Sequence, residues 1–338
     1  NNSDIVIINT CSVTNMADVK SRKMIRREKK ENPQSILVVC GCSAENHRLE
    51  LEDLGIDILI GNKDKSNIVS LIGEYQNNHK PITKFYDTRK LPFEDMEVDK
   101  FTSHTRGFIK IQDGCNNYCS YCIIPYVRGN IRSKDIDVAL KEAKELVANN
   151  HKEIVLTGIH TGSYGVGYDF DLVDLINKMS TIPGLKRIRL SSIEITELND
   201  KFMKLLKNNP ILCDHLHIPL QSGSEKILKL MNRKYDKARY ESIINQIRAI
   251  RPEISITTDV IVGFPGETES DFNECLDFCK KMQYAKIHVF PYSKREGTKA
   301  ASMPNQLDNK TKKDRARKLI ELSNELEEAY NQKFVGRN

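Results

Sequence analysis

Strands and helices alternate along most of this 338-residue chain, and the alternation restricts the fold more than any other feature. Charged segments with apolar residues at spacings of three and four predict helices between short aliphatic runs. Repeated strand–helix units of this kind fold into a parallel sheet. The runs after residue 107 predict six strands, at residues 108–111, 153–156, 187–190, 215–218, 255–262 and 286–290.

Six strand–helix units are too few for a closed eight-stranded barrel. We therefore expect residues 101–338 to form a partial (β/α)6 barrel of the TIM-like kind, with a doubly wound parallel sheet as the alternative. In both arrangements, the loops at the carboxyl ends of the strands carry the chemistry. Residues 310–334 form a charged helical pattern that we expect to pack across the barrel as a brace.

The first part of the chain has a smaller pattern of the same type. Apolar runs at residues 5–8, 36–39 and 56–60 predict an incomplete, flavodoxin-like parallel α/β domain over residues 1–85. A polar stretch with Pro92 predicts a linker at residues 86–100. The chain has 29% charged residues and no long apolar run, which argues against a membrane-spanning helix and favours a cytoplasmic location.

The nine cysteines are odd in number and unevenly placed, which fits metal ligation better than a disulfide framework. The peptide DGCNNYCSYC, residues 113–122, places Cys115, Cys119 and Cys122 in a Cys-x3-Cys-x2-Cys pattern after the first barrel strand. Three cysteines on one loop hold three irons of a cubane and leave the fourth iron open. A zinc site, and three buried or disulfide-bonded cysteines, are the alternatives.

With its tail IIPYVRG, residues 123–129, this loop resembles the methylthiotransferase branch of the radical-SAM superfamily. The resemblance implies that Cys115, Cys119 and Cys122 hold a [4Fe-4S] cluster. The open iron of that cluster then binds S-adenosylmethionine (SAM), which is cleaved to a 5′-deoxyadenosyl radical.

The same branch carries a second [4Fe-4S] cluster. The peptides NTCSVT (residues 9–14) and GCSA (residues 41–44) match two of its three ligand motifs, which assigns Cys11 and Cys42 to it. The resemblance puts the third ligand upstream of Asn1 and a TRAM-type RNA-binding domain beyond Asn338. Cys40 ends a Val-Val-Cys run, so we expect it to be packed in the core, like Cys213, Cys275 and Cys279.

Peptides beyond the cysteine loop resemble the enzymes of this branch that act on N6-threonylcarbamoyladenosine in tRNA. These peptides are LTGIH (156–160), GSYG (162–165), RLSSIE (189–194), HLHIPLQSGS (215–224), MNRKY (231–235), DVIVGFPGE (259–267) and HVFPYSKREGT (288–298). The resemblance implies addition of a methylthio group to C2 of this nucleoside, next to the anticodon, with SAM as both methyl donor and radical source. The same chemistry on isopentenyladenosine tRNA or on a ribosomal-protein aspartate is the first alternative. A zinc-stabilised RNA-binding module is an alternative from a different class.

The resemblance also implies roles for residues at the strand ends. The backbone near Gly158 offers carbonyls to the methionyl amine of SAM. Glu194 and Gln221 hydrogen-bond its ribose or carboxylate. Tyr121 and the edge formed by Val262 and Gly263 line its adenosyl group.

The formal net charge of +6 is too small to show by itself that the protein binds a nucleic acid. A basic run and three tyrosines give more specific indications of such a partner. The basic run at residues 20–30 either follows the phosphates of a tRNA anticodon stem-loop or forms a solvated helix face. Tyr126, Tyr164 and Tyr292 are candidates for stacking on loop bases. The implied chemistry also needs an electron donor such as flavodoxin or ferredoxin. We expect His160, His215, His217 and His288 to be rim or core residues rather than acid–base catalysts.

Overall fold

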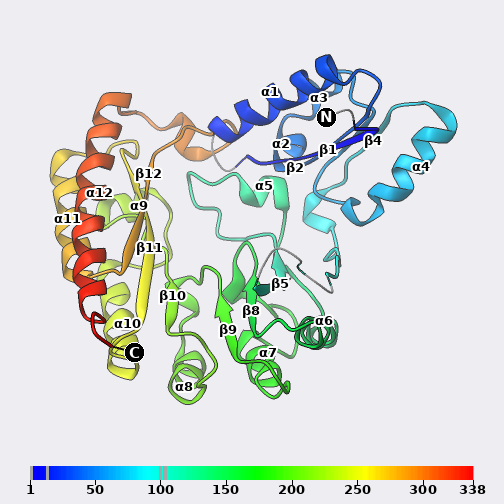
Figure 1. The fold of residues 1–338 in the computed structure, drawn as a ribbon. Helices are drawn as coiled ribbons and strands as arrows, with labels where there is room; N and C mark the ends of the chain where they lie inside the picture. The colour runs from blue at the N-terminus through cyan, green and yellow to red at the C-terminus, as the bar shows by residue number, and fades with distance from the viewer. Residues whose placement is uncertain (1–2, 13–14, 99–100, 102–104, 338) are drawn as a thin grey trace.

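The structure, a computed structural model, describes residues 3–12, 15–98, 101 and 105–337. It contains an N-terminal parallel sheet and an open barrel of parallel strands, with α5 (Ile124–Arg128) between them (Figure 1). The mixed α/β fold class is therefore confirmed. Residues 13–14 of the NTCSVT peptide and residues 99–100 of the expected linker lie outside the described residues.

The N-terminal sheet has four parallel strands in the order β1-β2-β3-β4. They are β1 (Ile5–Thr10), β2 (Ile36–Gly41), β3 (Ile58–Ile60) and β4 (Ile82–Lys84). The first three match the predicted strands. We did not predict β4, because only Ile82 of its three residues is buried and one apolar residue makes no readable pattern.

Helices flank this sheet on two sides, namely α1 (Asn15–Glu31), α2 (Cys42–Asn46), α3 (Arg48–Glu52) and α4 (Ile68–Asn78). Successive residues of β2 point to opposite faces, so the strand contributes to two cores. Leu37 packs in one core with Ile25 of α1. Val38 and Cys40 pack in the other with Leu71 of α4, which confirms the packing role expected for Cys40.

The barrel contains all six predicted strands in sequential order. They are β5 (Arg106–Lys110), β8 (Glu153–Thr157), β9 (Arg187–Leu190), β10 (His215–His217), β11 (Ser255–Val262) and β12 (Lys286–Pro291). β5, β8 and β9 form one parallel sheet and β10, β11 and β12 a second. The parallel bridges Ile188–Leu212 and Ser192–His217 join the two. Because the order never reverses, the arrangement is a partial barrel and not a doubly wound sheet.

Helices cover the outside of the barrel (Figure 1). They are α6 (Ile136–Ala148), α7 (Leu172–Met179), α8 (Asp200–Asn208), α9 (Glu225–Leu230), α10 (Lys237–Ile250), α11 (Glu269–Met282) and α12 (Asn309–Gln332). Side chains that accept backbone N–H bonds start most of them, including Asp135, Asp171 and Thr268. Their apolar faces and the strands share one large core.

The last helix, α12, packs along β12, as we expected of a brace. Leu319 and Leu322 are buried in the barrel core, and the Ser323 hydroxyl accepts the backbone N–H of Ile287 at 3.0 Å. Arg315 forms a buried ion pair with Glu267 in the loop after β11. Among the described residues, we find no helix with both the length and the apolarity that a membrane span requires.

Candidate active site

The cysteine loop leaves and re-enters the barrel at one place. β6 (Gln112–Asp113) pairs antiparallel with β7 (Arg132–Ser133), so the intervening residues form a closed loop at the carboxyl end of β5. The backbone N–H of Cys115 donates to the Gly129 carbonyl at 3.0 Å. The Ser120 hydroxyl donates to the Leu230 carbonyl at 2.8 Å. These bonds fix the loop between the barrel rim and the end of α9.

Cys115, Cys119 and Cys122 are all only partly exposed. None of the nine cysteines, all of which fall within the described residues, forms a disulfide, so the disulfide alternative is wrong for this structure. Burial raises the pKa of the Cys122 thiol to about 12. A hydrogen bond from the backbone N–H of Ile124 lowers this pKa, whereas the neighbouring Cys119 and Cys115 raise it further. Three sulfurs close enough to oppose each other's ionisation fit a cationic centre that all three ligate.

A single ion and a cluster require different spacings of their cysteine ligands. Within the described residues, no group of three or more His, Cys, Asp or Glu side chains is arranged to hold one metal ion. A mononuclear zinc site needs its ligands around one point at about 2.0 to 2.3 Å. A cubane binds each cysteine through a different iron, so its sulfurs stand further apart.

A buried arginine reaches the middle cysteine of the loop. Arg233 follows α9, and its Nη1 donates to Cys119 Sγ at 3.2 Å. Its Nη2 forms an ion pair with Glu194, and its Nε donates to the Tyr235 hydroxyl at 3.2 Å. Sequence reasoning missed this residue, because Arg233 and Cys119 lie 114 positions apart along the chain. Glu194, expected at the ribose or carboxylate of SAM, is held by this arginine.

We expect Arg233→Gln to lower the free energy of unfolding by about 2 kcal/mol, because Glu194 loses a charged partner while the amide keeps one donor. Urea denaturation of Arg233→Gln, Glu194→Gln and the double variant measures the effect. The two substitutions should couple by about 1 kcal/mol or more. Strictly additive effects would show that the pair does not contribute to stability.

A cavity of about 300 Å³ opens beside Cys122. Its walls come from both parts of the molecule: Ser12 follows β1, Tyr121 and Gln221 lie at the barrel rim, and Tyr292 and Arg295 follow β12. The buried Ser12 and Tyr292 hydroxyls have no hydrogen-bond partner among the described residues. Buried polar atoms without partners are rare in proteins, so the cavity fits a ligand with polar groups of its own.

The other residues expected to contact SAM do not line this cavity. Gly158 is half-buried, and a Cβ there would lie 3.0 Å from the Gln112 side chain, which is a tight contact. Val262 is fully buried in β11. The backbone N–H of Gly263 donates to Glu267 at 2.8 Å, and a Cβ on Gly263 would lie 2.5 Å from Lys312. Val262 therefore belongs to the barrel core, and Gly263 to the packing between the β11 loop and α12.

Gln112 is a second residue that the sequence did not reveal. Its Nε2 donates to the carbonyls of Asp113 and Gly114 at 2.8 and 2.7 Å, and its Oε1 accepts the backbone N–H of His160 at 2.7 Å. It thus ties the start of the cysteine loop to the loop after β8. Because the Gln112 amide is fully buried and makes these three hydrogen bonds, it fixes the backbone of the cysteine loop and of the loop after β8 relative to each other.

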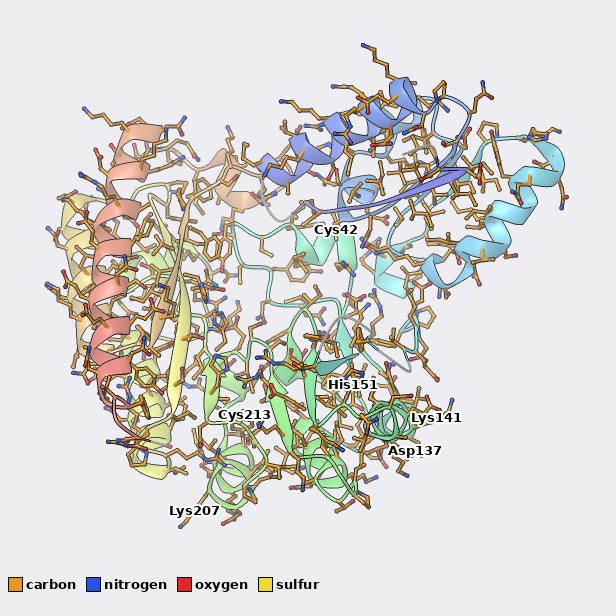
Figure 2. The ribbon with its side chains drawn as sticks, viewed as in Figure 1. Cys42, Asp137, Lys141, His151, Lys207 and Cys213 are labelled. Atoms are coloured by element: carbon orange, nitrogen blue, oxygen red, sulfur yellow. The ribbon has the colours of Figure 1, made fainter. Side chains whose placement is uncertain are left out.

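The two cysteines expected to bind a second cluster lie at the barrel-facing end of the N-terminal sheet. Cys11 is exposed after β1, and Cys42 is buried at the start of α2, facing α5 (Figure 2). Ser12, next to Cys11, lines the same cavity as Cys122. The segment after β1 and the cysteine loop therefore border one space. Cys213, Cys275 and Cys279 are buried elsewhere, as we expected.

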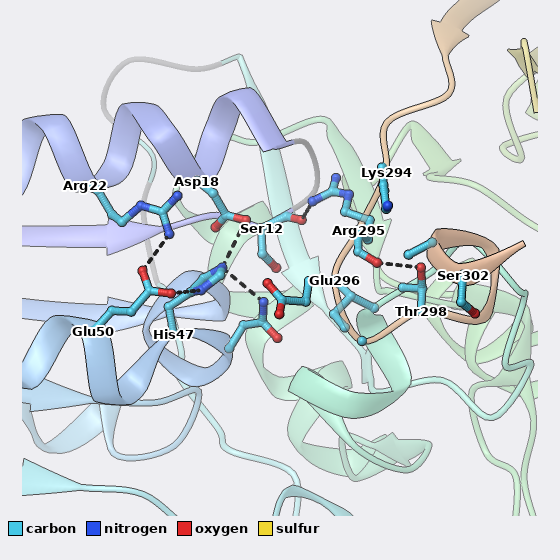
Figure 3. A pocket seen from close by; sticks show the side chains of 14 residues that line it. Ser12, Asp18, Arg22, His47, Glu50, Lys294, Arg295, Glu296, Thr298 and Ser302 are labelled. Atoms are coloured by element: carbon cyan, nitrogen blue, oxygen red, sulfur yellow. Dashed lines mark hydrogen bonds and ion pairs between the residues drawn. The ribbon is translucent and has the colours of Figure 1, made fainter. Parts of the chain in front are cut away.

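A larger cleft of about 810 Å³ adjoins the cavity and shares Ser12, Ile123 and Arg295 with it (Figure 3). It separates α1 and α3 from the loop after β12. Its lining is mostly polar, and includes Asp18, Arg22, Asn46, His47, Glu50, Lys294, Glu296, Thr298 and Ser302. Arg22 and His47 both pair with Glu50, at 3.1 and 3.4 Å.

The tyrosine prediction is wrong for Tyr164, whereas Tyr292 is buried but lines the cavity beside Cys122. Tyr126 is 53% exposed and remains available to a base, but Tyr164 is 1% and Tyr292 5% exposed. Tyr164 packs into the barrel core, and Tyr292 packs against Phe264 with ring centroids 5.4 Å apart. The sequence around an aromatic residue that follows a strand looks the same whether its side chain points to the solvent or into the core.

The four histidines occupy rim and core positions. His160 pairs with Glu197 at 2.5 Å, and His217 with Asp259 at 3.2 Å. The ring of His288 lies 5.6 Å from that of His217. His215 is half-buried and bonds Thr257 at 3.3 Å.

His215 makes stability depend on pH. Burial first, and then the charges of Arg189 and His217, lower its pKa to about 4. The unfolded side chain has a pKa of about 6.5, so the unfolded state binds a proton more readily between the two values. The contribution of the neutral His215 is therefore complete above about pH 6.5 and is lost as the pH falls towards 4. We expect the free energy of unfolding of His215→Asn, measured by urea titration, to depend less on pH between these values than that of the unaltered protein. The same pH dependence in both proteins would refute this.

An open barrel of parallel strands with a three-cysteine loop after its first strand defines the radical-SAM class of enzymes. The pattern of the Radical SAM superfamily matches residues 109–279. Residues 1–61 match a family described as "Uncharacterized protein family UPF0004".

Named relatives extend the match over nearly the whole chain. The threonylcarbamoyladenosine tRNA methylthiotransferase MtaB of Bacillus subtilis is 43% identical over 97% of this chain and 74% of its own length. The Aquifex aeolicus protein of the same name is 37% identical over 99% of this chain and 82% of its own. The tRNA-2-methylthio-N(6)-dimethylallyladenosine synthase of Clostridium tetani is 37% identical over the full chain and 76% of its own length. This chain therefore belongs to the methylthiotransferase family of radical-SAM enzymes, which implies SAM and a [4Fe-4S] cluster as cofactors.

Among solved structures, the chain is similar to the radical SAM methyltransferase TsrM from Kitasatospora setae, with a TM-score of 0.65 and 16% identity. The match covers 89% of this chain and 66% of TsrM. At this identity the likeness concerns the fold alone.

Proposed function

We propose that this protein adds a methylthio group to C2 of N6-threonylcarbamoyladenosine next to the anticodon of tRNA. The observation that carries the proposal is that Ser12, next to Cys11, and Cys122 of the cysteine loop line one cavity. The names of the MtaB relatives support the nucleoside. In this proposal, residues 1–85 form the domain that binds the second cluster and residues 101–338 form the domain that binds SAM. Residues 86–100 link the two domains.

Cys115, Cys119 and Cys122 hold the cluster that binds SAM, and Cys11 and Cys42 supply two ligands of a second [4Fe-4S] cluster. When bound, these cofactors supply a 5′-deoxyadenosyl radical and the sulfur for transfer. The chain itself provides placement and exclusion of water. Tyr121 and Gln221 line the cavity for SAM, while Gly158, Glu194, Val262 and Gly263 shape the strand ends around it.

The character of the larger cleft supports a polar substrate. A threonylcarbamoyl group carries a carboxylate, a hydroxyl and a urea, whereas an isopentenyl group is wholly apolar. The cleft offers the Lys294 ammonium group and the buried Ser12 hydroxyl, which has no hydrogen-bond partner among the described residues, and an apolar group would pair with neither. The basic helix α1 borders the cleft and suits the phosphates of an anticodon stem-loop. A cytoplasmic flavodoxin or ferredoxin provides electrons.

The test is nucleoside analysis by mass spectrometry after incubating the protein with SAM, a reductant and either of two tRNAs. One tRNA carries threonylcarbamoyladenosine and the other isopentenyladenosine. We expect the methylthiolated nucleoside only from the first. Product from the second tRNA alone would instead assign the protein to the enzymes that act on isopentenyladenosine. A colourless protein with about one zinc per chain would favour the zinc-stabilised RNA-binding module.

A further inference from the structure

The IIPYVRG tail after Cys122 forms the contact between the cysteine loop and the N-terminal sheet. Its residues make up α5, with Pro125 in the first turn, where a missing N–H is tolerated. Ile123 and Val127 are buried in one small cluster with Cys42. A residue expected to ligate the second cluster is thus packed on the segment that directly follows the first.

Arg128, at the end of this helix, links the two sites through its guanidinium group. Its Nε donates to Cys42 Sγ at 3.0 Å, and its Nη1 donates to Asp113 Oδ2 at 3.3 Å. Asp113 lies two residues before Cys115. A chain of charge-assisted hydrogen bonds therefore runs from Cys42 to the start of the cysteine loop, and such bonds are among the strongest in proteins.

Asn62 forms a second link at the same place. Its Nδ2 donates to the Val127 carbonyl at 2.8 Å and approaches Cys42 Sγ at 3.6 Å. Arg132 offers a comparison, because it also binds Asp113, at 3.2 Å, but its other hydrogen bonds go to the carbonyls of Arg128 and Asn130. The contact with sulfur distinguishes Arg128 from its neighbour.

We propose that α5 couples the two cluster sites and that Arg128 is the positioning residue that orients Cys42 for the second cluster. This role rests on the two-cluster function proposed above. It predicts that the second cluster depends on a residue of the barrel part of the chain. Groups that orient metal ligands typically change metal affinity about 10- to 100-fold when they are replaced.

The experiment isolates the second cluster. In the full-length protein with Cys115→Ala, Cys119→Ala and Cys122→Ala, only the second cluster remains to be counted. Into this variant we would introduce Arg128→Gln, Arg128→Lys or the control Arg132→Gln, and reconstitute each protein anaerobically. Iron per chain and the electron paramagnetic resonance (EPR) spectrum of the reduced protein are the readouts, with circular dichroism as a check on folding.

We expect Arg128→Gln to lose most of the iron in a folded protein, and Arg132→Gln to keep it. Arg128→Lys should regain iron but with an altered EPR spectrum, because one ammonium cannot serve both Cys42 and Asp113 as the guanidinium does. A triple cysteine variant that holds about four irons regardless of the residue at 128 would overturn the role of Arg128 alone. A triple cysteine variant without iron would overturn the second cluster as well.

Discussion

Replacing Cys115, Cys119 and Cys122 together by alanine is expected to remove about four irons per chain and to abolish reductive cleavage of SAM. The three half-buried sulfurs are the ligands that the loop offers to the cluster. Anaerobic iron and sulfide analysis measures the first effect. Chromatography of 5′-deoxyadenosine measures the second.

The matched control is Cys213→Ala, which removes a buried cysteine far from the loop (Figure 2). We expect this variant to keep its iron and to cleave SAM, with only a modest loss of stability. Iron that persists in the triple variant at the level of the unaltered protein would show that the loop does not bind a cluster.

Gly129→Ala is expected to lower the free energy of unfolding by more than about 4 kcal/mol. Gly129 ends α5 with φ at 74° and ψ at −159°, a conformation that suits glycine alone. A Cβ there would lie 1.9 Å from the backbone carbonyl oxygen of Thr88, which cannot move aside as a flexible side chain does. Urea denaturation measures the loss.

Gly167→Ala separates backbone strain from this clash. Gly167 also has a positive φ, 89°, but nothing lies within 4 Å of its added Cβ. We expect this variant to lose only about 1 to 2 kcal/mol. Equal losses in the two variants would mean that the contact between Gly129 and Thr88 is unimportant.

The main features of the fold were predictable because they depend on local patterns. The barrel strands are short apolar or alternating stretches separated by amphipathic helices, and the six stretches could be read directly from the sequence. The cysteine loop was predictable for a similar reason, since its three ligands lie within eight residues. The tail IIPYVRG was visible as a motif, but its position against Cys42 was not.

The residues that sequence reasoning missed act across long separations. Arg233 reaches Cys119 over 114 positions, and Arg128 reaches Cys42 over 86. An arginine that binds a thiol has the same local pattern as one on the surface, so only the packed structure distinguishes them. The direction of Tyr164 was unpredictable for a related reason, because a residue in a loop has no periodicity that reports its buried side.

The most direct test of the account uses tRNA whose threonylcarbamoyladenosine carries deuterium at adenine C2. The account predicts that deuterium appears in 5′-deoxyadenosine while the methylthiolated nucleoside forms, because the radical removes the atom that the methylthio group replaces. Methylthiolated product accompanied by 5′-deoxyadenosine without deuterium would contradict it.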